Sequence, residues 1–350
     1  MALFSIIPEA LAHQIMREMG MMEITLLSLC SDDTKTLVKS LMIPARQIIL
    51  NLANEPRIEV DFRQNEPQNL YFQLSENSFD EITFENQDKD ILQCHPTFIK
   101  ARHHHSREAI RFQYEKHDLK FWISHFLSIF DKSKLSLTYV DDGQVYPETE
   151  EEGGFFSAES IFQMFGGLEI LELDLVFSPT RNHSEEMLKM FPNSRQLALG
   201  DHEFRDSSLR SKIISRNWDR LDMGTDEFRL SLDELLSVNS VVLNCIIGFR
   251  EKELNAFLRH WINGGSSRLE YMQLFLRGER NFNVDVLFKQ IQYTKAPDDR
   301  RRSYLSSIGD NFEESKQDYY GGYDIMRRDG TKATIILDDY PLTLKFFVWD

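Results

Sequence analysis

Apolar residues near the start of the chain recur every three or four positions, which predicts a run of short helices. One stripe is formed by Leu11, Ile15 and Met19. Pro8 suits the first turn of this helix, a second helix is expected over residues 23–29, and Ser31 caps a third helix that ends before Pro44. A unit of about forty residues cannot bury all of its apolar side chains, so we expect it to pack on the rest of the chain or on a partner.

Segments further along the chain alternate between strand and helix patterns. The sequences RIEVDFR (57–63) and LYFQL (70–74) alternate apolar and polar residues, as half-buried strands do. The segment 118–130 predicts a helix whose apolar face carries Leu119, Trp122, Ile123, Phe126 and Phe130. The segment 250–265 predicts another helix, which ends at Gly264 or Gly265 and carries the stripe Leu254, Phe257, Leu258 and Trp261.

A pattern of the form LxxLxL returns five times in the second half of the chain. Its starts at positions 168, 194, 218, 238 and 269 are 26, 24, 20 and 31 residues apart, near the length of leucine-rich repeats. The core positions are Leu168, Leu171 and Leu173; Ser194, Leu197 and Leu199; Trp218, Leu221 and Met223; Val238, Val241 and Leu243; and Leu269, Met272 and Leu274. Each step predicts one strand with a helix or loop returning behind it. The irregular steps and the missing asparagine ladder indicate a solenoid-like arrangement, not a regular horseshoe.

Together these patterns predict a mixed α/β protein. A three-helix unit over residues 3–44 is followed by one large α/β domain over residues 45–350, with leucine-rich-repeat-like, solenoid-like strands over 168–276. Asp329-Gly330 is a two-residue turn signal, so the chain is expected to end in a β-hairpin over 322–350. The acidic segment 141–154 is expected to be an exposed loop inside the large domain.

Charge and cysteine content restrict the function classes. The formal net charge is −16, which argues against binding to nucleic acid or to an acidic membrane, because both need a basic surface. The three cysteines, Cys30, Cys94 and Cys245, form no CxxC pair, as is typical of a reducing compartment. We see no signal peptide and no apolar segment long enough to span a membrane, so we expect a cytoplasmic or nuclear protein.

The histidines near residue 100 are the candidate for a metal site. His103, His104 and His105 are consecutive, with Cys94 and His95 nearby, but three consecutive side chains cannot all face one ion from a regular strand or helix. We therefore interpret this segment as a solvated basic loop and expect neither a metal nor another cofactor. The sequence also contains no Walker loop, GxSxG, HExxH or CxxC motif, so we expect no catalytic activity.

A family motif is found in the N-terminal unit. It consists of Ile7-Pro8-Glu9, Ile15, Met19, Met22-Glu23-Ile24 and Leu27-Ser28-Leu29-Cys30-Ser31. This pattern resembles the F-box, and LLSLCSDDTKTLVKSL (26–41) resembles its nematode version, with Ile7 where leucine is usual. The resemblance implies docking on the Skp-type adaptor of a cullin–RING ubiquitin ligase. The implied adaptor-binding residues are Ile7, Pro8, Glu9, Ile15, Ile24, Leu27, Leu29, Cys30 and Leu37.

A second family motif is found in the C-terminal half. Leu254-Asn255, Phe257-Leu258, Trp261, Gly264 and Arg268-Leu269-Glu270-Tyr271 follow the pattern LNxFLxxWxxGxxxRLEY. The sequence resembles the F-box-associated domain of nematode F-box proteins, and YDIMRRDGTKATI (323–335) resembles the ending of that family. The resemblance implies a non-catalytic substrate-recognition subunit of an SCF-type ubiquitin ligase, which holds a target protein for ubiquitination and degradation. The alternatives are a ligase-independent interaction scaffold and, third, an enzyme with a cryptic site.

The residues between the core positions of the repeats are the candidate target-binding surface. On a strand they point away from the core, so they share one face if the strands lie side by side. The candidates are Glu172, Asp174, Asp222, Asn244, Gln273 and Phe275. Loops at the strand ends are the alternative recognition site.

Overall fold

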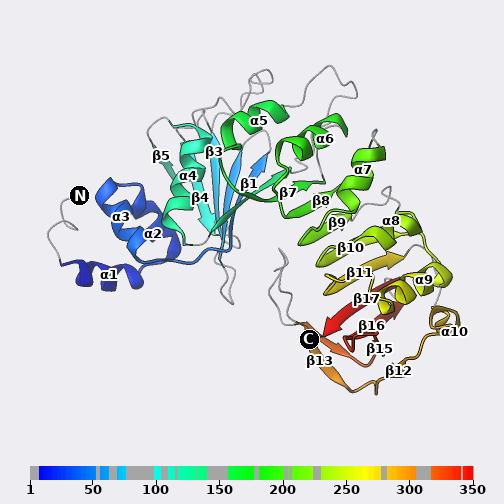
Figure 1. The fold of residues 1–350 in the computed structure, drawn as a ribbon. Coiled ribbons are helices and arrows are strands. Elements are labelled where there is room, and N and C mark those ends of the chain that lie inside the picture. The colour runs from blue at the N-terminus through cyan, green and yellow to red at the C-terminus, as the bar shows by residue number, and fades with distance from the viewer. Residues whose placement is uncertain are drawn as a thin grey trace. The chain divides into compact units, whose positions relative to one another are not determined.

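In the computed structural model, the first elements of the chain are three helices (Figure 1). They are α1 (Glu9–Arg17), α2 (Met21–Ser28) and α3 (Asp32–Ser40). The predicted cap of the third helix is present, because Ser31 Oγ accepts a hydrogen bond from the Thr34 N–H at 3.2 Å. The three expected helices are confirmed, and the second begins at Met21 rather than Glu23.

The structure describes residues 8–52, 56–62, 69–75, 98–103, 109–114, 117–131, 133–139, 157–176, 181–200, 204, 207–223, 230–276, 282–304, 317–339 and 342–349. The chain divides into two compact units, Met1–Ser194 (unit 1) and Arg195–Asp350 (unit 2). Because α1–α3 belong to unit 1, this division does not coincide with the predicted domain boundary after residue 44. The predicted domain limits mark functional modules rather than compact units. They are therefore not tested by this division and stay a prediction. The predicted loop at 141–154 lies outside the described residues.

A mixed sheet forms the centre of unit 1, with the strand order β7-β6-β1-β2-β3-β4-β5. Its strands are β1 (Gln47–Leu52), β2 (Arg57–Asp61), β3 (Leu70–Ser75), β4 (Phe98–His103), β5 (Ile110–Gln113), β6 (Lys134–Tyr139) and β7 (Ile170–Leu175). Strands β1, β6 and β7 run parallel to one another. Each strand from β1 to β5 is antiparallel to the next one in the chain. The alternating patterns of β2 and β3 are confirmed, with Ile58, Val60 and Phe72 buried on one face.

Helix α4 (Leu119–Ile129) packs on that buried face of the unit 1 sheet. The rings of Phe72 on β3 and Phe126 on α4 lie 4.8 Å apart between centroids. The predicted apolar face is buried along the whole helix, from Leu119 to Phe130, so this prediction is confirmed. Helices α5 (Ala158–Phe165) and α6 (Arg181–Met190) precede and follow β7.

The interpretation of the histidine segment as a loop is wrong for its central part. Residues 98–103 form β4, which pairs with both β3 and β5. Tertiary pairing decided this, since the short apolar run Phe98-Ile99 is followed by basic residues and shows no clear period in the sequence. Cys94, His95, His104 and His105 lie outside the described residues.

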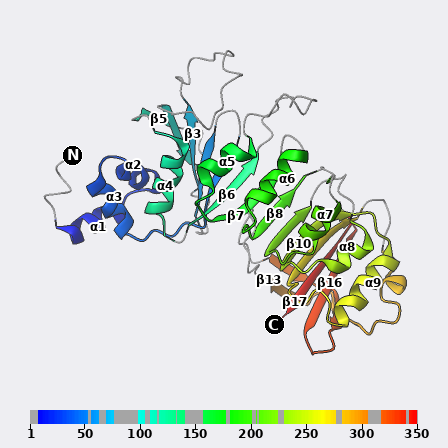
Figure 2. The same ribbon diagram turned by 45° about the horizontal axis from the view of Figure 1, so that its top comes forward.

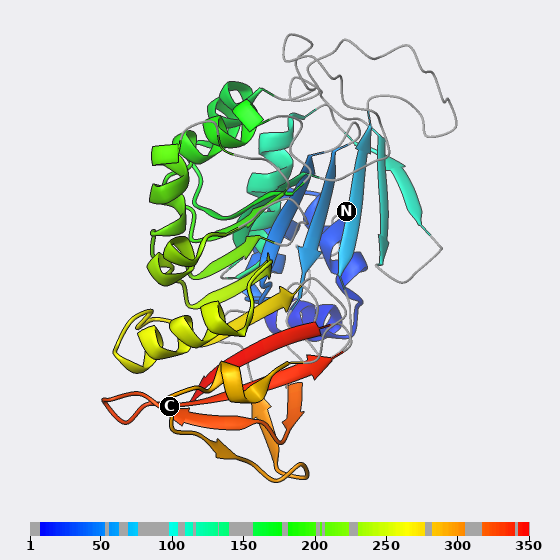
Figure 3. The same ribbon diagram turned by 90° about the vertical axis from the view of Figure 1, so that its right-hand side faces the viewer.

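Unit 2 begins with four parallel strands in sequential order. They are β8 (Gln196–Leu199), β9 (Arg220–Met223), β10 (Val242–Ile247) and β11 (Tyr271–Leu276). Each is followed by a helix: α7 (Ser207–Ile214), α8 (Leu232–Ser237), α9 (Glu251–Ile262) and α10 (Val284–Leu287). Helices α7, α8 and α9 line one face of these strands (Figures 2 and 3). The predicted alternation of strand and helix after residue 194 is confirmed.

Most of the predicted core positions of the repeats are buried, but three are not. Leu168, Leu171 and Val241 are only half-buried, whereas Ile170, Leu173 and Leu175 form the core side of β7. The β6–β7 register shifts between Leu135 and Ser136, and this irregularity inserts an extra residue into β7 and changes which side chains face inward.

Antiparallel strands complete unit 2. They are β12 (Thr294–Lys295), β15 (Tyr323–Met326), β16 (Lys332–Asp339) and β17 (Leu342–Trp349), in the sheet order β12-β15-β16-β17-β11. A separate two-stranded ribbon is formed by β13 (Arg301–Tyr304) and β14 (Gln317–Tyr320). Gly330 has φ +94° in the turn between β15 and β16, so a turn at Asp329-Gly330 is confirmed. The turn is longer than the predicted two residues, because the Arg327 N–H donates to the Thr331 carbonyl oxygen at 2.8 Å across a loop of three residues. The chain ends in three antiparallel strands rather than in a single hairpin.

The helix with the predicted stripe 254–261 is α9, and its stripe is fully buried. Gly264 follows it with φ +99°, which is the left-handed conformation that ends a helix. Trp261 packs edge-on against Phe346 of β17, with ring centroids 5.1 Å apart, and the Arg327 guanidinium lies 5.2 Å from the Trp261 ring centroid. Burial of this stripe attaches α9 to the sheet of unit 2.

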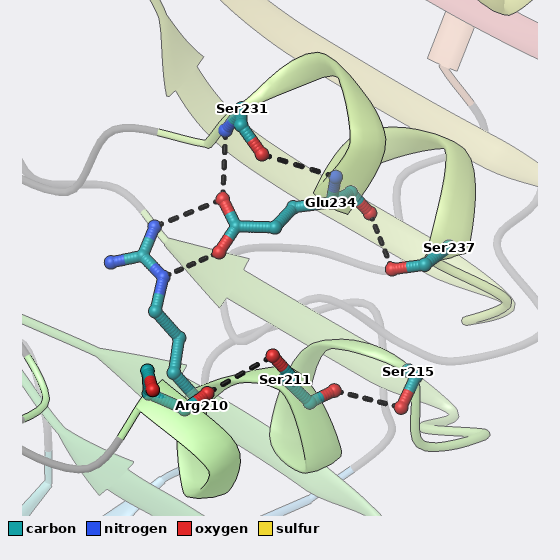
Figure 4. A network of polar contacts seen from close by, with 7 residues as sticks. Arg210, Ser211, Ser215, Ser231, Glu234 and Ser237 are labelled. Atoms are coloured by element: carbon teal, nitrogen blue, oxygen red, sulfur yellow. Dashed lines mark hydrogen bonds and ion pairs between the residues drawn. The ribbon is translucent and has the colours of Figure 1, made fainter.

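A polar network joins α7 to α8 (Figure 4). Arg210 donates from Nε to Glu234 Oε1 at 2.6 Å and from Nη2 to Glu234 Oε2 at 3.2 Å. The Ser231 N–H also donates to Glu234 Oε2, at 2.7 Å, while Ser231 Oγ accepts from the Glu234 N–H at 3.2 Å. Partial burial raises the pKa of Glu234, but the hydrogen bonds from Arg210 and Ser231 outweigh it, so the pKa is lowered overall.

Replacing Glu234 by alanine is expected to lower the free energy of unfolding by about 1–2 kcal/mol, because both the capping box and the Arg210 pair are lost. Urea unfolding of the full chain at pH 7 measures this change. The matched control is Asp233→Ala, which removes an exposed carboxylate from the same helical turn and should cost no more than about 0.5 kcal/mol. Equal losses in the two variants would contradict a structural role for the network.

Candidate interaction surfaces

The first candidate surface lies on helix α1. Leu11 is 46% exposed and Ile15 is 42% exposed, and their spacing of one helical turn places them on the same side. Ala12 and Met16 are buried, and the His13 ring lies 2.7 Å from Ser40 Oγ at the end of α3. The predicted stripe therefore exists, but most of it faces solvent. An exposed apolar pair on a small helical unit is a typical protein-binding feature.

Helix α2 is attached to the body of unit 1 by buried polar contacts. The Ser28 hydroxyl lies 2.8 Å from His125 Nε2 of α4, and the Tyr114 hydroxyl donates to the Leu29 carbonyl oxygen at 2.7 Å. Ile24 and Leu29, on and directly after this helix, are also buried. Helix α2 is thus packed on the rest of unit 1 rather than joined to it by the chain alone.

The Ser28–His125 pair has the distance of a nucleophile–base pair but not the chemistry. The Ser28 hydroxyl donates its proton to the Thr25 carbonyl oxygen at 2.6 Å, so His125 is the donor in the Ser28–His125 contact. Ser28 is 2% exposed and His125 is 3% exposed. Burial, reinforced by the charge of Lys35, lowers the pKa of His125 to about 4. The pair has a structural role.

This lowered pKa predicts that acid weakens the protein. Between pH 6.5 and about 4 the unfolded chain binds a proton at His125 that the folded chain excludes, so stability falls as the pH falls through this range. Burial also lowers the pKa of His183 in α6 to about 4, which acts in the same direction. We expect each histidine to account for a loss of about 2 kcal/mol between pH 7 and pH 5.

Urea unfolding at pH 7, 6 and 5 measures this dependence, and His125→Gln should make it shallower while retaining a donor for Ser28. A variant whose stability falls as steeply with acid as that of the wild type would show that His125 is already protonated in the folded protein.

The predicted adaptor-binding residues fall into three groups. Pro8, Glu9, Ile15 and Cys30 are exposed, and Leu27 and Leu37 are half-buried. The prediction for Ile24 and Leu29 is corrected, because both side chains are buried within unit 1 and do not present a surface to a partner. Ile7 lies outside the described residues. Two exposed apolar residues were missed as site residues: Leu11, which belongs to the predicted stripe, and Met42, which is 65% exposed and for which the sequence carries no signal.

The second candidate surface is the face of the unit 2 sheet that points away from α7–α9. Asp222, Asn244 and Gln273 are direct neighbours across β9, β10 and β11, as predicted. Asp222 Oδ1 accepts from Asn244 Nδ2 at 2.6 Å, Asp222 Oδ2 accepts from Arg220 Nε at 2.7 Å, and Gln273 Oε1 accepts from the Tyr271 hydroxyl at 2.7 Å. These polar groups form a half-buried row, and most of their hydrogen bonds are made within the row or to the residues beside it.

An aromatic cluster covers the neighbouring row of the same face. Val242, Tyr271 and Phe347 are buried there, and Tyr304 and Tyr319 of the β13–β14 ribbon pack on them. The ring centroid of Phe347 lies 5.2 Å from that of Tyr304 and 4.2 Å from that of Tyr319. The ribbon therefore closes part of the face on which target binding was predicted.

The predicted target-binding residues differ in accessibility. Asp174, Asp222, Asn244, Gln273 and Phe275 are half-buried. Glu172 is 4% exposed, so its prediction as a surface residue is wrong. Alternation identified the face to which each side chain points, but not the segments that cover that face.

Two other classes of site are absent from the part of the chain that the structure describes. No group of three or more histidine, cysteine, aspartate or glutamate residues is placed there to hold a metal ion. None of the helices described is long and apolar enough to cross a membrane.

Comparison with known sequences shows which proteins this chain is similar to. Residues 210–274, which run from α7 to β11, match the family model for F-box associated proteins. This segment is therefore similar to F-box associated domains, as the LNxFLxxWxxGxxxRLEY pattern predicted. It is similar to the F-box associated domain-containing protein sdz-33 of Caenorhabditis elegans, with 27% identity over 195 residues, or 54% of each chain.

The match thus spans about half the length of that curated relative. The resemblance to nematode F-box associated proteins is confirmed by these two matches. No solved structure matches this chain.

Proposed function

We propose that the protein is the substrate-recognition subunit of an SCF-type ubiquitin ligase. In this proposal α1–α3 are an F-box that binds a Skp-type adaptor, and the adaptor links the chain to the cullin–RING ligase. The observation that carries the proposal is the exposed pair Leu11 and Ile15 on a three-helix unit, in a chain whose residues 210–274 match the F-box associated family. The protein would act in the cytoplasm or nucleus.

The role proposed for the rest of the chain is to hold a target protein near the ubiquitin-transfer site. Such a receptor accelerates transfer by proximity and needs no catalytic group of its own. The sequential parallel strands β8–β11, each followed by a helix, support a leucine-rich-repeat-like, solenoid-like interpretation of unit 2. The half-buried row Asp222, Asn244 and Gln273 and the loops beside it are the proposed target contacts.

Copurification tests the proposal. The full chain, coexpressed with a Skp-type adaptor, should be recovered as a stable stoichiometric complex and should then bring down cullin. Recovery of the folded chain without adaptor would contradict the ligase role and favour a ligase-independent scaffold.

A further inference from the structure

We infer that the exposed face of strands β2–β5 in unit 1 binds an extended, acidic segment of a partner protein. This face lies opposite the one on which α4 packs. The inference concerns a surface that the proposed adaptor and target contacts do not use, and it holds whether or not the chain joins a ligase.

Strand pairing places basic side chains in one row across this face. Arg57 of β2 lies opposite Gln73 of β3, Gln73 lies opposite Lys100 of β4, and Lys100 lies opposite Arg111 of β5. Residues directly opposite in antiparallel strands point to the same side of the sheet. Arg57 and Arg111 are exposed and Lys100 is half-buried, so the row is open to solvent.

A fourth cation lies beside the row. Arg102 is two residues from Lys100 on β4 and therefore points to the same face, with its guanidinium 5.3 Å from the ring centroid of Tyr71. This position holds Arg102 against the sheet while leaving it exposed.

Among the described residues of this face, the acidic groups Glu59 and Asp61 are already engaged. Asp61 Oδ2 lies 3.6 Å from Arg46 Nη1. Glu59 accepts a hydrogen bond from Asn69 at 2.9 Å, and burial raises the pKa of Glu59. Within the described residues Arg57 and Lys100 form no ion pair of their own. In a chain of net charge −16, a row of cations of this kind is a local feature that an anionic partner would neutralise.

The spacing of the row suits an extended peptide. Neighbouring strands are about 4.8 Å apart, so the row spans about 14 Å from β2 to β5. In an extended chain, side chains on one side recur about every 6.8 Å, so acidic residues at i, i+2 and i+4 cover nearly the same span. Nucleic acid is the less favoured occupant, because a single narrow row on an acidic protein lacks the wide basic surface that phosphate backbones need.

Fluorescence anisotropy of the full chain with a labelled decapeptide of alternating glutamate and threonine tests this inference. The triple variant Arg57→Gln, Lys100→Gln and Arg111→Gln should bind this peptide at least about fivefold more weakly, from three exposed ion pairs. Binding should also weaken between low and high salt. The matched control is Lys39→Gln, Lys120→Gln and Lys212→Gln, which removes three exposed cations elsewhere and should bind within about twofold of the wild type.

The thermal transition of each variant shows whether it is folded, so that a loss of binding caused by unfolding is recognised. The charge-conserving variant Arg57→Lys with Arg111→Lys should keep both the fold and the binding. Equal weakening in the row and control variants would overturn the inference, as would equal binding of a glutamine–threonine peptide. Tighter binding of single-stranded dT10, with displacement of the acidic peptide, would also overturn it in favour of a nucleic-acid site.

Discussion

Replacing Trp261 by alanine is expected to lower the free energy of unfolding by about 3–5 kcal/mol. Trp261 is 0% exposed and fills the space between α9 and β17, where it contacts Phe346 edge-on. The truncation removes this apolar contact area and leaves a cavity, because α9 is held in place by Leu254, Phe257 and Leu258 and cannot collapse into the space.

The measurement is urea unfolding monitored by circular dichroism, and a lower midpoint at unchanged slope would identify a loss of stability. Tyr320→Ala is the matched control, since Tyr320 is also an aromatic residue of unit 2 but is 59% exposed. The control should change the free energy of unfolding by less than about 0.5 kcal/mol. A Trp261 variant no less stable than the Tyr320 variant would show that α9 is not held by this side chain.

Replacing Ile15 by aspartate is expected to weaken adaptor binding at least about tenfold, or about 1.4 kcal/mol, and Leu11→Asp with Ile15→Asp should abolish copurification. A carboxylate in a closed apolar contact would lose its hydration without gaining a partner. Both side chains are more than one-third exposed in the free chain, so the fold should be unaffected.

Titration of purified Skp-type adaptor against each variant, by calorimetry, measures the effect. Ile110→Asp on β5 is the control: it is the same substitution at a residue that is 45% exposed, far from α1 in the sequence. Undiminished affinity in a folded Ile15→Asp variant would remove α1 from the adaptor interface. The ligase proposal would then depend on α2 and α3 alone.

Local patterns were sufficient for the elements whose period is strong. Helices α4 and α9 carry continuous 3.6-residue stripes, and each buries the predicted residues. Strands β2 and β3 alternate cleanly, and Asp329-Gly330 forms the turn between β15 and β16 because glycine adopts a positive φ without strain. The family motif was also readable, since its residues lie close together in the sequence.

The coverage of each face was decided only by the tertiary structure. Val242 and Tyr271 alternate with the core positions of their strands, as outward-facing residues do. The β13–β14 ribbon, which comes later in the chain, nevertheless covers them. Ile24 and Leu29 resemble partner-binding residues in the sequence but are buried in the folded chain. Periodicity determines which side of an element a residue lies on, but not what packs against that side.

The sequence by itself determined the positions of the main helices and strands, the mixed α/β class and the F-box associated motif, because each depends on residues within a few turns of one another. The structure alone brought Arg57, Lys100 and Arg111 into one row and left Leu11 and Ile15 exposed. The physical reason is that strands pair through hydrogen bonds between their backbones. The order of side chains along the chain therefore does not reveal which strands will become neighbours.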